Sequence, residues 1–210
     1  MGDRTRIPRR LFVGLGLIAV VWTLSWTHTR PFSDYAFFPL WFGYILTVDA
    51  LVYLRTATSP IARHGPRVAL LFVSSIGLWW LFELLNERVQ NWHYITPREY
   101  SPLAYALLAT IAFSTVTPAV FTTTELVRSW GLDPLRRLPA LRQTRRFLLS
   151  AHLAGWAMLV SLLVFPDVAF PVMWLSLIFL LDPLVTVLGG HSIGRYVERG
   201  DWSPVFNLAL

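Results

Sequence analysis

Residues 79–94 read WWLFELLNERVQNWHY, a run in which acid, amide and imidazole side chains stand among aromatic rings. A carboxylic acid such as Glu83 can donate or accept a proton, and Asn86 and His93 are close enough in sequence to act with it. In a helix, Glu83, Asn86, Glu87 and Gln90 have the i, i+3, i+4, i+7 spacing of a single face. We therefore predict Glu83, Asn86 and His93 as catalytic candidates. The residues predicted to contact a ligand are Trp79, Trp80, Glu87, Gln90, Asn91, Trp92 and Tyr94.

An alternative interpretation of this run is a membrane-interface belt, because Trp and Tyr concentrate where a helix leaves the lipid. The belt explains the rings well. It explains Glu83 and Asn86 less well, since both come before the apolar run ends.

Four further ionisable residues lie inside apolar runs: Asp49, Glu125, His152 and Asp182. Each costs at least ~2.5 kcal/mol at the centre of a bilayer, so such groups face partners or a cavity. We expect the four to lie at similar height near one membrane surface, where they could form a polar pocket or a proton path. The alternative is that they bond to neighbouring helix backbones or to arginines of the loops.

The composition is that of a membrane protein. The chain has 210 residues, 55% hydrophobic and 14% charged, with a mean hydropathy of +0.52, whereas soluble domains are about 25% charged. Cysteine is absent and the five histidines lack the i, i+4 pairing of a metal-binding helix, so no metal or cofactor is predicted. The net charge of +6 comes from arginines between apolar runs, which indicates membrane anchoring and not nucleic-acid binding.

The apolar runs predict an all-α polytopic transmembrane bundle with six spans, because each run reaches the roughly 20 residues that a bilayer requires. Fifteen of the eighteen arginines fall in alternate loops, which predicts both termini on the cytoplasmic side of the inner (plasma) membrane. A short helix is predicted to start at Ser203 and Pro204. The predicted spans are 11–27, 35–54, 67–86, 102–126, 147–165 and 169–189.

Two stretches of the chain resemble each other at an offset of 133 residues. DYAFFPLWFGYILTVDALV at 34–52 matches DVAFPVMWLSLIFLLDPLV at 167–185, and Asp49 corresponds to Asp182. Four intervening helices keep the orientation, so the prediction is a parallel repeat whose second copy is incomplete, with a further acidic and aromatic motif expected beyond residue 210. The predicted single transmembrane domain, 1–210, comprises copy one at about 9–100, a linker helix at 101–127, an Arg-rich cytoplasmic loop at 128–146 and copy two at about 145–210.

The motifs FFPLWFGYILTVD and WWLFELLNERVQNWHY resemble an uncharacterised family of bacterial polytopic membrane proteins over residues 35–95 and, through the repeat, 167–210. A weaker similarity is to membrane carotenoid cyclases of the lycopene-cyclase type. Glu83, Trp92 and Tyr94 are the matching positions, and the paired-acid proline motif of those cyclases is missing.

Three functions follow from these observations. The leading hypothesis is that the protein binds or converts a lipid-like, isoprenoid or similarly apolar small molecule through Glu83 and Asn86, from the outer leaflet. The alternatives are a noncatalytic subunit with membrane-protein partners, and a small transporter that uses Asp49 and Asp182. Whether the protein is an enzyme stays open at this point. The bilayer is the one partner common to all three.

Overall fold

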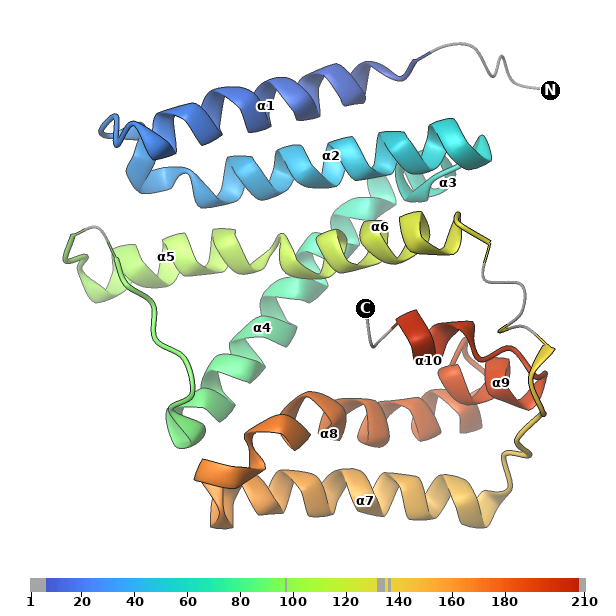
Figure 1. Ribbon diagram of the computed structural model, residues 1–210. Helices are drawn as coiled ribbons and strands as arrows, with labels where there is room; N and C mark the ends of the chain where they lie inside the picture. The colour runs from blue at the N-terminus through green and yellow to red at the C-terminus, as the bar shows by residue number, and fades with distance from the viewer. Residues whose placement is uncertain (1–6, 97, 132–134, 136, 208–210) are drawn as a thin grey trace. The chain divides into compact units, whose positions relative to one another are not determined.

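The computed structural model describes all residues except 1–6, 97, 132–134, 136 and 208–210. The described chain is all-helical and contains no strand, and six of its helices are long and apolar enough to cross a membrane (Figure 1). The predicted fold class and the six predicted spans are therefore confirmed. The observed spans are Arg9–Trp26, Phe37–Thr56, Pro60–Val89, Pro102–Arg128, Arg145–Val164 and Pro166–Val187.

The chain divides into two compact units. Unit 1 is Met1–Phe82 with Ile95–Trp130, and unit 2 is Glu83–Tyr94 with Gly131–Leu210. Helix α4 (Ala69–Val89) begins in the first unit, and its last turns belong to the second. The single transmembrane domain remains a prediction.

Unit 1 is built on a hairpin of α1 (Arg9–Trp26) and α2 (Phe37–Thr56), which are joined through the 3-10 helix η1 (Phe32–Tyr35) (Figure 1). The short helix α3 (Pro60–His64) follows α2, and Ser59 caps it by accepting a hydrogen bond from the N–H of Ala62. A second 3-10 helix, η2 (Gly65–Val68), leads into α4.

The fourth span is broken at its middle into α5 (Pro102–Phe113) and α6 (Val116–Arg128), where sequence predicted one continuous helix. Ser75 of α4 bridges the break. Its hydroxyl donates to the carbonyl of Phe113 (2.5 Å) and accepts from the N–H of Thr117 (2.9 Å). Those two backbone groups would bond each other in a regular helix, so the Ser75 side chain is inserted into the ladder.

Unit 2 contains a second hairpin, formed by α7 (Arg145–Val164) and α8 (Pro166–Val187), with Phe165 as its whole connection (Figure 1). Two short helices follow, α9 (Ile193–Glu198) and α10 (Ser203–Asn207). The predicted helix start at Ser203 is therefore present.

Each hairpin contains one close contact of the same kind, between a glycine of its first helix and the backbone of its second. A Cβ atom added to Gly14 of α1 would lie 2.8 Å from the backbone N of Thr47, and one added to Gly155 of α7 would lie 2.7 Å from the backbone N of Leu180. Thr47 and Leu180 each precede an aspartate by two residues. Common descent of the two halves stays a prediction, but this contact gives a shared reference point for comparing them.

Candidate functional site

The polar run at the end of α4 folds into a tight turn. The helix ends at Val89, and Gln90 adopts the left-handed conformation with φ of 54°. Asn86 is buried and holds the turn: its Oδ1 accepts from the N–H groups of Asn91 (3.0 Å) and Trp92 (3.4 Å), and its Nδ2 donates to the Trp92 carbonyl (2.9 Å). The predicted four-residue helical face therefore loses Gln90, because the Asn86 amide bonds to the chain beyond the helix.

This turn brings two aromatic side chains back onto Glu83. Trp92 Nε1 donates to Glu83 Oε1 (3.1 Å), and the Tyr94 hydroxyl donates to the same oxygen (2.6 Å). His93 is exposed, and no hydrogen bond or ion pair within the described chain joins it to Glu83. The partners of the Glu83 carboxylate are those of a residue that stabilises the loop after α4. A contact between Glu83 and His93 is not among them.

Trp92 also ties the turn to α8. Its ring stacks on Trp174 with centroids 5.8 Å apart and packs against Phe170 at 6.3 Å. Arg88 adds a second tie, because its guanidinium donates twice to the carbonyl of Leu163 near the end of α7 (2.8 and 3.2 Å). The cluster of polar and aromatic groups thus joins the end of α4 to the second hairpin.

The other predicted ligand contacts are divided between the units. Trp79 and Trp80 belong to unit 1, where both rings pack against Phe113 and the indole N–H of Trp80 donates to Thr110 Oγ1 (3.0 Å). Glu87 belongs to unit 2 and is exposed.

Asp49 is fully buried in unit 1 and is surrounded by donors. Its Oδ1 accepts from the N–H of Ile61 (2.9 Å), and its Oδ2 accepts from the hydroxyl of Ser59 (2.9 Å) and forms an ion pair with Arg10 Nε (2.6 Å). Arg10 also donates to the Ser59 hydroxyl (3.1 Å) and lies 5.0 Å from the centre of the Tyr53 ring. The negative charge is therefore both paired and hydrogen-bonded, as a buried carboxylate requires.

Glu125 is paired as well. Its Oε2 lies 2.9 Å from Arg63 Nη2. Arg63 is on α3, and α3 also supplies the Ile61 N–H to Asp49. The short helix α3 thus contacts both Asp49 and Glu125, through an arginine and a backbone N–H, as the alternative interpretation expects.

Asp182 also stands two residues after the close-contact residue of its hairpin, Leu180, but it has different partners from Asp49. Its Oδ1 accepts from the N–H of Ile193 (2.5 Å), and its Oδ2 accepts from the N–H of Gly194 (2.9 Å), both at the start of α9. Ser192 caps α9 as Ser59 caps α3, but here the cap serine accepts from Thr186 (2.6 Å) and does not contact the acid. Within the part of the chain that the structure describes, Asp182 forms no ion pair.

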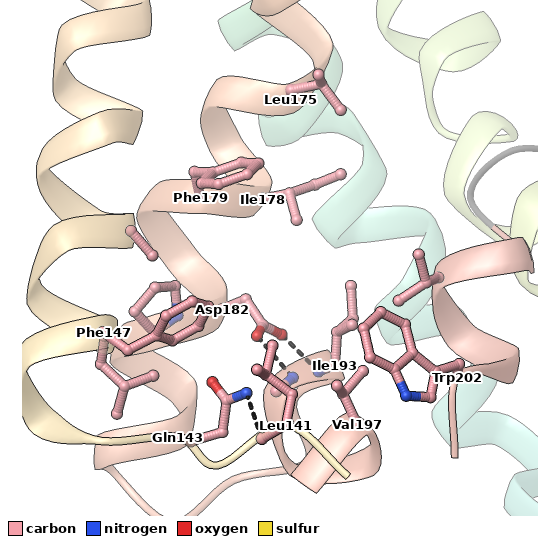
Figure 2. A pocket seen from close by; sticks show the side chains of 15 residues that line it. Leu141, Gln143, Phe147, Leu175, Ile178, Phe179, Asp182, Ile193, Val197 and Trp202 are labelled. Atoms are coloured by element: carbon pink, nitrogen blue, oxygen red, sulfur yellow. Dashed lines mark hydrogen bonds between the residues drawn. The ribbon is translucent and has the colours of Figure 1, made fainter. Parts of the chain in front are cut away.

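The Asp182 side chain lies in the wall of a pocket of about 540 Å³. Figure 2 shows its two bonds to the start of α9, with Phe179, Ile178 and Leu175 above it on α8. Apart from Asp182 and Gln143, the lining is apolar or glycine, with the indole N–H of Trp202 directed to the carbonyl of Pro139. The remaining lining residues are Leu141, Phe147, Leu148, Ala151, Pro183, Ile193, Gly194, Val197 and Val205.

His152 is next to this pocket in sequence, but both of its ring nitrogens are already bonded. Trp156 Nε1 lies 3.1 Å from Nε2, and the carbonyl of Leu180 lies 3.0 Å from Nδ1. An indole N–H only donates and a carbonyl only accepts, so the geometry assigns the neutral tautomer with its proton on Nδ1. His152 is therefore an interhelical donor to α8. The convergence of the four ionisable groups, three acids and one imidazole, stays a prediction.

Outside the spans, Arg98 joins the loop after α4 to η1, the connection between the two helices of the first hairpin. Its guanidinium donates to the Tyr35 hydroxyl and lies 5.1 Å from the centre of the Tyr100 ring. A hydrogen bond with Tyr100 and the negative charge that Tyr35 can carry raise the pKa of Arg98. The guanidinium therefore keeps its charge, and Asp34 lies 4.0 Å from its Nε.

Sequence reasoning missed the two short capped helices that hold the aspartates. The pairs Ser59-Pro60 and Ser192-Ile193 each begin one, and Ser before Pro is a recognisable helix start. It also missed Arg10, whose position in the first turns of a span looks like simple anchoring at the interface.

Comparison with known protein families, with curated proteins and with solved structures finds no match. Both family resemblances therefore stay predictions. The six long apolar helices define the class as a multi-pass membrane protein.

Proposed function

We propose that this membrane protein binds a lipid-like small molecule in the pocket formed by α7, α8, α9 and α10. The single observation that carries the proposal is the apolar cavity of about 540 Å³ with the Asp182 carboxylate in its wall. Sites for small apolar ligands have such a volume, roughly 300–1,000 Å³, with few polar groups. The ligand class is the one that the sequence predicts, but the best-supported site moves from Glu83 to Asp182.

Binding, and not conversion, is the activity that the lining supports. Asp182 is the one titratable side chain among the residues that form the pocket, so a second acid, base or nucleophile is missing from that set. Transport by a matched Asp49 and Asp182 pair has weaker support, because Asp49 is buried under an ion pair and two hydrogen bonds. A role as a noncatalytic subunit of a membrane complex stays a prediction, and no contact of the described residues favours it.

The pocket lies at the end of α8 that the arginine distribution assigns to the cytoplasm. Leu141 and Gln143, from the segment just before α7 that the arginine distribution also assigns to the cytoplasm, line the pocket. This supports access for the ligand from the inner leaflet. The outer-leaflet location predicted from sequence applies to Glu83 and not to this pocket.

Photolabelling tests this proposal. The full chain in phospholipid nanodiscs would be irradiated with a long-chain alcohol that carries a diazirine, and the labelled peptides would be mapped by mass spectrometry. Labels are expected on the pocket lining, and Ile178→Trp, which fills the pocket, should remove them. The matched control is Leu181→Trp on the same helix, because Leu181 is 52% exposed and does not line the pocket. Labels that are spread over the apolar exterior and unchanged by Ile178→Trp would refute binding in the pocket.

A further inference from the structure

The two hairpins place different residues beside their aspartates. In the first, Arg10 lies one helical turn before Gly14, the glycine of the close contact, and its guanidinium reaches Asp49. In the second, the residue one turn before Gly155 is Ala151. Ala151 lines the pocket together with Asp182. Where the first hairpin has the guanidinium of Arg10, the second hairpin therefore has the methyl group of Ala151 and the open pocket.

The two carboxylates otherwise have related surroundings. Asp49 follows Thr47 by two positions, and Asp182 follows Leu180 by two. Each carboxylate accepts a hydrogen bond from a backbone N–H of a short helix that starts at a capping serine. The difference is in charge. Asp49 has an arginine within 2.6 Å, whereas Asp182 has two neutral N–H donors and no ion pair to any described residue.

We propose that the ligand of this pocket carries a cationic head group, an ammonium on an apolar chain, which binds Asp182 where Arg10 binds Asp49. This inference rests on the proposed function and names its ligand class. A carboxylate has about four lone-pair positions, and the two backbone donors leave room for a further donor from the pocket side. A charged donor gives the stronger bond, and it neutralises an acid that is otherwise surrounded by apolar walls.

The rest of the lining fits the chain of such a molecule. Leu175, Ile178 and Phe179 line the pocket along α8 away from Asp182 (Figure 2). A ligand with its ammonium at Asp182 would place its chain against these side chains. Gln143 is the second polar group of the wall, and its Nε2 donates to the Leu141 carbonyl (3.1 Å). Its amide is neutral, so Asp182, the one charged group of the lining, is the group that selects a cationic head.

An ammonium on an apolar chain occurs both in free single-chain amines and in phospholipids with an ethanolamine head. Nanodiscs with and without ethanolamine lipid separate these sources. If the phospholipid is the ligand, ethanolamine lipid should compete with an amine probe, and if a free amine is the ligand, it should not. Either result agrees with the proposal.

The test compares two diazirine probes that differ only in the head group, dodecylamine and dodecanol. Wild-type protein should label with the amine at about tenfold lower concentration, which corresponds to about 1.4 kcal/mol. Asp182→Asn should remove this preference and keep the labelling by dodecanol. Asp167→Asn is the matched control, because it removes an exposed carboxylate from the other end of α8.

Ala151→Arg is a second test that leaves Asp182 in place. The new guanidinium should occupy the acid as Arg10 does in the first hairpin, raise the unfolding temperature and abolish the preference for amine. Ala151→Met, which adds a flexible chain without charge, should weaken labelling by both probes equally. Equal labelling of wild type by amine and alcohol, lost in both with Ile178→Trp, would overturn the cationic head group and keep the pocket. Absence of any label in the pocket would overturn the proposed function itself.

Discussion

The guanidinium of Arg10 and the carboxylate of Asp49 form an ion pair of 2.6 Å in which the acid is completely shielded and the arginine side chain is 22% exposed. This pair connects the first turn of α1 to the end of α2 and, through Ser59, to the start of α3. It is the main electrostatic difference between the two hairpins.

Removal of Arg10 is expected to destabilise unit 1 strongly. Arg10→Met would leave a buried carboxylate without its cation, and breaking one side of such a pair costs about 3–5 kcal/mol. Thermal unfolding in detergent measures the effect. Arg9→Met is the control, since the neighbouring Arg9 is exposed. Equal unfolding temperatures for the two variants would contradict a structural role for the pair.

Ser75→Ala should destabilise the break between α5 and α6. The change leaves the carbonyl of Phe113 and the N–H of Thr117 without their shared partner, at a cost of about 1–3 kcal/mol. The control is Ser74→Ala, because Ser74 is exposed and bonds only within its own helix, to the Leu71 carbonyl. A Ser75→Ala protein as stable as the control would mean that the backbone closes the gap unaided.

A structural role for Glu83, in which its carboxylate stabilises the loop after α4, can be tested by mutation. Glu83→Gln keeps an acceptor for Trp92 and Tyr94, so hydrogen exchange of residues 90–96 should rise only slightly, whereas Glu83→Leu should raise it greatly. Glu87→Leu is the control, since Glu87 is exposed on the same turn of α4. If Glu83→Gln and Glu83→Leu protect the loop equally, the carboxylate does not fasten it.

Gly155→Ala is expected to separate α7 from α8. The added Cβ would lie 2.7 Å from the backbone N of Leu180, and backbone there cannot move aside as a flexible side chain does. Overpacking of this kind costs about 1–3 kcal/mol, so the unfolding temperature should fall. Gly77→Ala provides the comparison, because no atom lies within 4 Å of its added Cβ. Ala has the higher helix propensity, so Gly77→Ala should be neutral or stabilising. An equal rise in both variants would contradict the close contact at Gly155.

Sequence patterns predicted the helices well because a bilayer permits few alternatives. A run of about 20 apolar residues must satisfy its backbone internally, and this decides both the number of spans and their type. The carboxylates of Asp49 and Asp182 were recognised for the same reason, since charge inside an apolar run is rare. The hydrogen bonds of Glu83 and Asn86 to the chain beyond α4 were not predicted, because the turn that brings Trp92 and Tyr94 back depends on a chain reversal at Gln90. Their catalytic role stays a prediction.

The sequence by itself determined that the chain has membrane-spanning segments, that these are helices, and that two of them carry aspartates at matching positions. Only the tertiary structure decided that one aspartate is paired and that the other lies in a pocket. The reason is the axial register of each hairpin: Thr47 follows its glycine, Gly14, by 33 residues, but Leu180 follows Gly155 by 25. The first connection spans residues 27–36 and the second is Phe165 alone. The length of a connection sets which side chains of adjacent helices meet, and so it placed an arginine beside Asp49 and an alanine beside Asp182.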